Sequence, residues 1–257
     1  MGFGQHVECD AIQHRAIRFF LGVHRFAPIH AVTGDTGWDP CITRRHTNML
    51  RYWNRVVRLD EHRLTRKILM WDFALNTKNW SAEICSIFEN LNLEIEDLFR
   101  IDITASRLKL RSDYETKWLQ AMQQKPKLRT YVLFKNNYKL ESYVSSNLTR
   151  SQRSFLAQLR SGVLPLRVET GRFQNEQLEN RLCVFCESMS IEDEYHFLLH
   201  CDLYDDLRRH LFYSLVDNVF HISSDSEKIK LLLHNNFKQV AQFVEKAFLR
   251  RRDKLYS

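Results

Sequence analysis

Half of the chain's six cysteines lie in one short stretch, CVFCESMSIEDEYHFLLHC, at residues 183–201. Two, nine and four residues separate Cys183, Cys186, His196 and Cys201 in turn. A Cys-x-x-Cys turn presents two thiolates to one ion, and a helix starting near Asp193 would bring the histidine and the last cysteine to the same ion. The spacing therefore predicts one zinc ion held by a closed Cys3His set.

The expected role of this zinc is structural, because four protein ligands leave no open position for water or substrate. His200 is the rival histidine ligand, but it adjoins Cys201 in sequence, and the two could reach one ion only with awkward geometry. We expect Asp193, three residues before His196, to accept the imidazole N–H that faces away from the metal. The alternative interpretation is a chance cluster of buried thiols.

The elements that must position these ligands are expected to be helices. Only 7 glycines and 4 prolines among 257 residues leave little material for tight hairpins or Gly-rich phosphate loops. We expect a mainly α fold, with a helical bundle-like N-terminal part followed by a small Cys3His zinc-binding helical domain. The expected regions are a thumb-like helical part at 1–75, a helical connector at 76–147 and the zinc-binding domain at 148–257.

Two long helices are predicted in the N-terminal part. Apolar residues at steps of three and four predict a helix over residues 9–26, ended by Pro28 and a turn at 34–37. Its expected buried residues are Ile12, Ala16, Phe19, Phe20 and Val23. A second helix is predicted from about residue 43 to 73, because that stretch contains no helix breaker. Its expected buried side carries Met49, Trp53, Val57, Leu64 and Ile68.

Shorter helices are predicted in the rest of the chain. The pattern indicates helices around 81–90 and 106–123. Thr149, with Gln152 three residues later, forms a capping-box pattern at the start of a helix that Gly162 would close. After the cysteine cluster we expect two or three further amphipathic helices, the first of which includes 207–216.

Arginines gather beside the apolar side of the second predicted helix. The stripe contains Arg51, Arg55, Arg58, His62 and Arg66, next to Arg44 and Arg45. Spacings of three and four stack such side chains on one helix face. A net charge of +7 also favours a polyanionic partner. We expect the six arginines of this set to contact the phosphate backbone of RNA or DNA, and the alternative is a solvated face that pairs with Asp60 and Glu61.

The sequence argues against a membrane protein or a secreted one. No apolar stretch approaches the roughly 20 residues that cross a bilayer. The first residues, MGFGQHVECD, lack the apolar run of a signal peptide. We therefore expect an intracellular protein, nuclear or cytoplasmic, in a reducing compartment, with no small-molecule substrate.

Several segments together resemble one protein family. RSGVLPLRVETGR, NRLCVFC, EDEYHFLLHC and DLYDDLR resemble the zinc-binding C-terminal region of animal non-LTR (LINE-type) retrotransposon reverse transcriptases. AIRFFLGVHRFAPIHAVTGDTGWDP resembles the end of the thumb in the same proteins. The resemblance implies the same four zinc ligands, with Tyr204 and Arg208 in the family's usual tail, and it implies an RNA or DNA partner.

The chain departs from the family in lacking a polymerase centre. That centre needs three aspartates, two of them in a Tyr-x-Asp-Asp box, to hold two metal ions. Tyr204-Asp205-Asp206 lacks the intervening residue, and we interpret its aspartates as favourable charges at a helix N-terminus. No endonuclease pattern is present either. We therefore expect no enzyme activity, and a non-catalytic nucleic-acid-binding portion of such a polymerase.

Two other classes of function are considered. The chain could be a zinc-stabilised helical protein-interaction module or an inert remnant of a mobile element, in which case it would not bind nucleic acid. A zinc hydrolase or deaminase would need an open coordination site and a His-x-Glu motif before a Pro-Cys-x-x-Cys motif, and the sequence lacks that arrangement.

Overall fold

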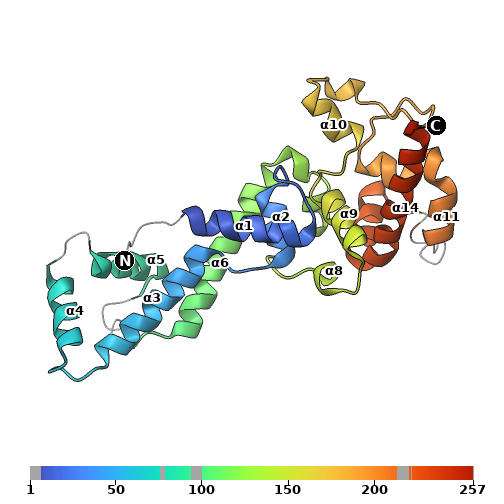
Figure 1. Cartoon of the computed structure of the whole chain (residues 1–257). Coiled ribbons are helices and arrows are strands. Elements are labelled where there is room, and N and C mark those ends of the chain that lie inside the picture. Colours follow the sequence, from blue (N-terminus) through green and yellow to red (C-terminus); the bar gives the residue numbers. More distant parts are fainter. Residues whose placement is uncertain (1–6, 76–78, 94–99, 213–219, 221, 257) are drawn as a thin grey trace. The chain divides into compact units, whose positions relative to one another are not determined.

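The computed structural model describes residues 7–75, 79–93, 100–212, 220 and 222–256. Within these residues the fold is helical, and the only strand-like pairing is an isolated bridge between Leu182 and Ile191. The predicted mainly α class is therefore confirmed (Figure 1). No helix in the described part of the chain is both long and apolar enough to span a membrane.

The helices run in the following order. The first six are α1 (Val7–Leu21), α2 (Ile29–Thr36), α3 (Cys41–Val57), α4 (Leu64–Ala74), α5 (Trp80–Leu91) and α6 (Ile103–Gln123). They are followed by α7 (Tyr131–Phe134), α8 (Ser142–Ser145), α9 (Arg150–Arg160) and α10 (Arg167–Phe173). A π turn, η4 (His196–His200), precedes α11 (Asp205–Phe212), α13 (Asp225–Asn235) and α14 (Phe237–Tyr256). The rest of the helix predicted over 207–216 lies outside the described residues.

The chain divides into two compact units. Unit 1 comprises Met1–Gln13 and Asp39–Lys117, and unit 2 comprises His14–Trp38 and Trp118–Ser257. Helices α1 and α6 each contribute residues to both units. The three regions expected from the sequence, 1–75, 76–147 and 148–257, divide the chain at other positions than these two units do. They stay a prediction.

The core of unit 1 forms around Trp53 of α3. Its ring lies 5.6 Å from that of Phe88 in α5 and 5.7 Å from that of Phe73 in α4, measured between centroids. The side chain of the neighbouring Asn54 donates to the carbonyl of Ile101 and accepts from its backbone N–H, at 2.7 and 3.1 Å. This pair of hydrogen bonds satisfies buried polar groups and fixes the segment that leads into α6.

The single long helix predicted over 43–73 is wrong. The chain leaves the helix after Val57 and turns back through residues 58–63 before α4 begins. The turn is stabilised by Asp60, whose carboxylate accepts the backbone N–H of His62 at 2.8 Å. Folding back lets Leu69 of α4 join the core beside α3, which a continuous helix could not do. Met49, Trp53 and Val57 are buried as expected, whereas Leu64 and Ile68 are exposed.

The apolar residues predicted to mark the buried side of the first helix are exposed, except for Val23, which is buried but lies beyond the end of the helix. Helix α1 ends at Leu21, and it buries the apolar side chains of Ile17 and Leu21 and the polar side chain of Gln13. Phe19 and Phe20 are instead exposed, as is Ile12. Residues 34–36, predicted as a turn, form the end of α2, and Gly37 closes that helix with a left-handed φ of 59°.

Unit 2 is built on α9 and α14, which pack against each other. Thr149 and Gln152 form the predicted capping box at the start of α9. Gly162 closes the helix with a φ of 66°, and a β-carbon there would lie only 2.0 Å from the carbonyl oxygen of Lys127. Both sequence predictions for this helix are therefore confirmed, and only glycine suits position 162.

A buried charge network lies at the centre of unit 2. Arg160 of α9 donates to both oxygens of Asp35 at 3.0 and 2.9 Å, and to Glu141 at 2.8 Å. The hydroxyls of Tyr131 and Tyr143 donate to the same Asp35 carboxylate at 2.9 and 2.7 Å. Burial opposes ionisation of Asp35, but the charge of Arg160, the hydrogen bonds from Arg160 and Tyr143 and the charge of Lys135 together outweigh burial and lower the pKa of that carboxyl. We call Asp35, Tyr131, Glu141, Tyr143 and Arg160 the Arg160 network.

This burial predicts a delayed titration of tyrosines. Burial raises the pKa of Tyr131, Tyr143 and Tyr204 above the ordinary value. A group with a raised folded pKa stabilises the fold below its unfolded pKa, about 10 for tyrosine, and that stability is lost as the pH rises further. We therefore expect three of the nine tyrosines to ionise only as the chain unfolds in alkali, followed by tyrosinate absorbance and circular dichroism.

The matching variant is Tyr143→Phe, which should remove one of the three delayed tyrosines. Its free energy of unfolding should fall by about 2 kcal/mol, because one hydrogen bond to a buried, charged carboxylate is lost. Ionisation of all nine tyrosines before any loss of helical signal would contradict the structure.

Candidate metal centre

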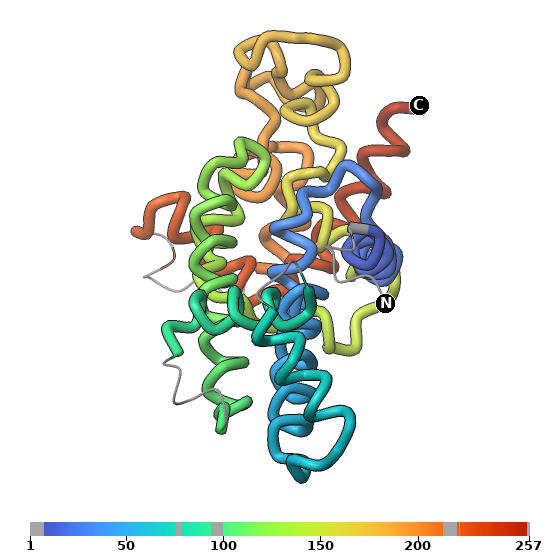
Figure 2. Tube along the Cα trace, turned by 90° about the vertical axis from the view of Figure 1, so that its left-hand side faces the viewer, coloured from blue at the N-terminus to red at the C-terminus, as the bar shows by residue number. Residues whose placement is uncertain are grey.

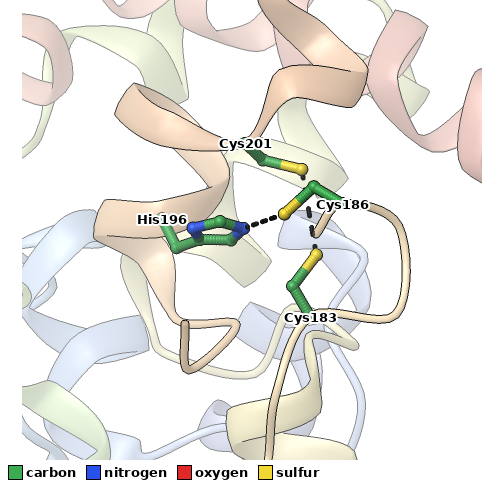
Figure 3. Close-up of side chains that lie close together, drawn as sticks. All are labelled: Cys183, Cys186, His196 and Cys201. Carbon is green, nitrogen blue, oxygen red and sulfur yellow. Dashed lines mark hydrogen bonds between the residues drawn. The ribbon is translucent and has the colours of Figure 1, made fainter. Parts of the chain in front are cut away.

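The four predicted ligands lie together in unit 2. The ligand atoms of Cys183, Cys186, His196 and Cys201 are all within 4.8 Å of one another, and Figure 3 shows the side chains pointing toward one another. The Sγ atoms of Cys183 and Cys201 are 3.8 Å apart, and Cys186 Sγ is 3.3 Å from His196 Nε2. This is a Cys3His group that could hold a metal ion.

The donor set and its size fit a tetrahedral ion. With metal–sulfur bonds of about 2.3 Å, a tetrahedron has sulfur–sulfur edges of about 3.8 Å. The distance between Cys183 and Cys201 matches that edge, and the shorter sulfur–nitrogen distance is consistent with a shorter metal–nitrogen bond. Cys183, His196 and Cys201 are buried and Cys186 is half-buried, so the group would surround an ion closely.

The first two cysteines are placed by a short hairpin-like turn. Leu182 and Ile191 pair as an antiparallel bridge, and the backbone N–H of Cys183 donates to the carbonyl of Ser190 at 2.9 Å. The backbone N–H of Phe185 points toward Cys183 Sγ at 3.5 Å, as expected where amides stabilise a thiolate. Figure 2 shows the stretch from α10 to the π turn, in gold and orange, as a compact set of turns.

The other two ligands come from the π turn. The backbone N–H of Cys201 donates to the carbonyl of His196, five residues earlier, at 2.8 Å. In an α-helix, residues five apart point about 140° apart around the axis, which would separate the two ligands. The wider i→i+5 turn brings them round to the same side. The sequence prediction of a helix from Asp193 is confirmed, but the π geometry that makes the helix suitable was missed.

Hydrogen bonds that share protons among the side chains of this group shift their pKa values. A hydrogen bond between Cys201 and Cys183 lowers the pKa of Cys183 to about 3 and raises the pKa of Cys201. A hydrogen bond with Cys183 also raises the pKa of His196. Negative charge is therefore stabilised where a cation would sit, and a bound ion would displace the shared protons.

His200 and Asp193 lie beside the Cys3His group, and among the described residues neither makes the contact with His196 or the group that the sequence leads us to consider. His200, the rival ligand, points away from the group, and its Nε2 lies 2.7 Å from the carboxylate of Asp225. The sequence predicts that Asp193 accepts an imidazole N–H of His196, but the hydrogen bond found in the described residues is from the backbone N–H of His196 to the Asp193 carboxylate, at 2.9 Å. Asp193 therefore caps the turn that carries His196, as a helix N-cap residue does.

The loop that carries Cys183 and Cys186 is held by contacts other than those of the metal ligands. The buried carboxylate of Glu192 accepts from Arg251 of α14 at 2.9 Å and from the backbone N–H of Arg167 at 2.8 Å. The Arg251 guanidinium lies over the ring of Phe185, 4.4 Å from its centroid, inside the Cys-x-x-Cys turn. We call Phe185, Glu192 and Arg251 the Arg251 clamp.

The Tyr204-Asp205-Asp206 sequence forms no carboxylate pair for metal ions. Asp205 and Asp206 lie in the first turn of α11, as the sequence predicts. Asp206 pairs with Arg250 at 2.7 Å, and Asp205 pairs with Arg209 at 3.0 Å. Hydrogen bonding to Arg250 lowers the pKa of Asp206 to about 2.

The predicted phosphate-binding arginines are found in unit 1 in different surroundings. Arg51 and Arg55 lie exposed on α3, and the exposed Arg58 directly follows it. Arg45 pairs with Glu83 at 2.8 Å, and Arg66 donates to the carbonyl of Leu59 at 2.7 Å. Arg44 is exposed, but it donates to Gln13. His62 lies in the turn between α3 and α4, so the predicted stripe does not follow one helix.

Comparison with known proteins gives no relative. No protein-family model, curated protein or solved structure matches this chain. The function must therefore be argued from the sequence and the structure.

Proposed function

We propose that the chain is a non-catalytic, nucleic-acid-binding C-terminal portion of a non-LTR retrotransposon reverse transcriptase, with one structural zinc ion. The proposal places it in the nucleus or cytoplasm. It is supported by the sequence resemblance described above, by the Cys3His group and by the exposed arginines of α3.

Zinc is the proposed ion because of the donor set. Three thiolates with one imidazole at tetrahedral spacing are the ligands that zinc prefers in structural sites. Four protein donors leave no open coordination position, so the ion would stabilise the turn and would not activate water. A site closed in this way fits a structural role and does not fit a hydrolase or deaminase.

The observation that carries nucleic-acid binding is the row formed by Arg51, Arg55 and Arg58, which we call the α3 row. Steps of four and three residues place the three side chains on one side over a length of about 10 Å. Arg55 and Arg58 form no ion pair with a carboxylate in the described residues, and Arg51 donates to the neutral Asn48. Phosphate oxygens would supply the missing negative charge, with little dependence on base sequence.

Replacing the α3 row by Ala should weaken binding to every nucleic acid by a similar factor. The slope of log K against log salt concentration should flatten by about one unit per lost phosphate contact. Fluorescence anisotropy with labelled RNA and DNA of several sequences, measured over a range of salt concentrations, gives both quantities.

A matched control removes the same charge elsewhere. Arg209→Ala, Lys246→Ala and Arg252→Ala together change exposed side chains on α11 and α14. Binding should respond much less to this control than to loss of the α3 row. Equal losses in both triple variants would mean that only net charge matters and that the α3 row is a solvated face.

A second candidate function is a helical protein-interaction module. One face of α4 and its end exposes the apolar side chains of Leu64, Ile68, Trp71 and Leu75 to solvent. Their steps of four, three and four residues are typical of a helix face that packs against a partner helix. A parent chain that binds no RNA or DNA at low salt would favour this function over the first.

A further inference from the structure

Two exposed phenylalanines at the end of α1 lie beside arginines of α9 in unit 2. Phe19 is 73% exposed and Phe20 is 48% exposed. The guanidinium of Arg150 lies 5.3 Å from the Phe19 ring centroid, and that of Arg153 lies 5.4 Å from the Phe20 centroid. Arg15, one helical turn before Phe19, is also exposed. We call these five residues the aromatic–arginine face.

The face is held in place by direct contacts between the two helices. The carbonyl of Gly22, at the end of α1, accepts from Ser154 Oγ of α9 at 2.6 Å. Arg153 also donates to the carbonyl of Ser146 at 3.2 Å, which restrains its guanidinium beside Phe20. The rings and guanidiniums are therefore organised before any ligand arrives, and binding would order few side chains.

Among the described residues, the aromatic–arginine face carries positive charge without a paired carboxylate. Arg15, Arg150 and Arg153 form no ion pair with a carboxylate in the part of the chain that the structure describes. Exposed aromatic rings favour a flat apolar surface, and uncompensated guanidiniums favour an anion. An acidic peptide would supply the charge, but a nucleotide supplies both a planar ring and a phosphate.

We propose that the aromatic–arginine face binds single-stranded nucleic acid. Bases stack on Phe19 and Phe20, and the adjoining phosphates contact Arg15 and Arg150. A duplex cannot bind in this way, because its base faces are already stacked on one another. The inference rests on the proposed function in taking a nucleic acid as ligand, but it assigns a separate surface and a strand preference.

The test compares strand types in the full chain. Labelled oligothymidylate and oligouridylate, and a duplex of the same length, are titrated at one salt concentration and followed by anisotropy. Replacing both Phe19 and Phe20 by Ala should weaken single-strand binding by about ten-fold or more, as expected for lost stacking. Duplex binding should change less than two-fold, since no charge is removed, whereas loss of the α3 row should weaken both.

Two further variants make the result specific. Phe19→Tyr keeps a ring and should bind single strands as the parent does. Phe173→Ala removes another exposed ring, 65% exposed in α10, for which no guanidinium contact is described, and it should change neither affinity. Since Phe19 and Phe20 are exposed, unchanged thermal unfolding of the double variant is expected and shows that the fold is kept.

The outcomes separate the two proposals. Parent-like single-strand binding by the double alanine variant would overturn this inference alone. An equal loss on single strands and duplex would also overturn it, because stacking would not be the cause. A parent chain that binds neither strand type would remove the proposed function together with this inference.

Discussion

Cys183→Ser should abolish binding of the proposed zinc ion and lower the free energy of unfolding by about 4 kcal/mol or more. The metal site does not exist in the unfolded chain, so the free energy of metal binding contributes directly to folding. The loss should be smaller than the standard binding free energy, about 10–16 kcal/mol in isolated zinc fingers, because the stabilisation by a ligand depends on its free concentration relative to its Kd. Metal analysis after dialysis gives the occupancy, and urea unfolding gives the stability.

His200→Ala is the control for the choice of ligand. His200 belongs to the same turn as His196, but it contacts Asp225 and lies outside the Cys3His group. This variant should keep one zinc per chain and parent-like stability. Zinc retained by Cys183→Ser at the parent's occupancy, or zinc lost from His200→Ala, would show that the ligand assignment is wrong.

Arg160→Met should lower the free energy of unfolding by about 3–5 kcal/mol. Methionine leaves the buried carboxylate of Asp35 without the cation that pairs with it, whereas the half-buried Glu141 keeps its ion pair with Lys135. A buried charge without a partner is far more costly than the absence of the whole pair. Urea unfolding measures this loss as a lower midpoint concentration. An unchanged m value would show that the stability has changed and not the surface exposed on unfolding.

Two controls test that explanation. Arg150→Met removes an exposed arginine from the same helix, and it should change stability by no more than about 0.5 kcal/mol. Adding Asp35→Asn to Arg160→Met removes one stranded charge, so the double variant should be more stable than Arg160→Met alone. If Arg160→Met unfolded at the parent's urea concentration, the Arg160 network would contribute nothing to folding.

The features that could be predicted from sequence are those encoded by neighbouring residues. The capping box of Thr149 and Gln152 needs only a three-residue spacing, and it lies where the pattern places it. The helices around 81–90 and 106–123 correspond to α5 and α6 for the same reason. The grouping of the four metal ligands also follows from local spacing, since all lie within one short stretch.

The predictions that were wrong concern features that depend on contacts between residues far apart in the sequence. Periodicity shows that α1 has an apolar side with Phe19 and Phe20, but not which side meets the core. That is decided by α9, whose Ser154 binds the end of α1 across more than a hundred residues of sequence. The turn at 58–63 also depends on distant contacts, because it lets Leu69 pack in a core formed with other helices. No local sequence pattern describes that core.

The Arg251 clamp links the metal centre to the far end of the sequence. Arg251 lies in the last two turns of α14, yet it contacts Phe185 between two of the metal ligands. If these contacts help to hold the four ligands together, thermodynamic reciprocity applies: a partner that strengthens the contact of α14 with Glu192 raises the affinity for a metal ion, and metal binding favours that partner by the same factor. A ligand of the C-terminal helix would therefore act as an effector of metal retention.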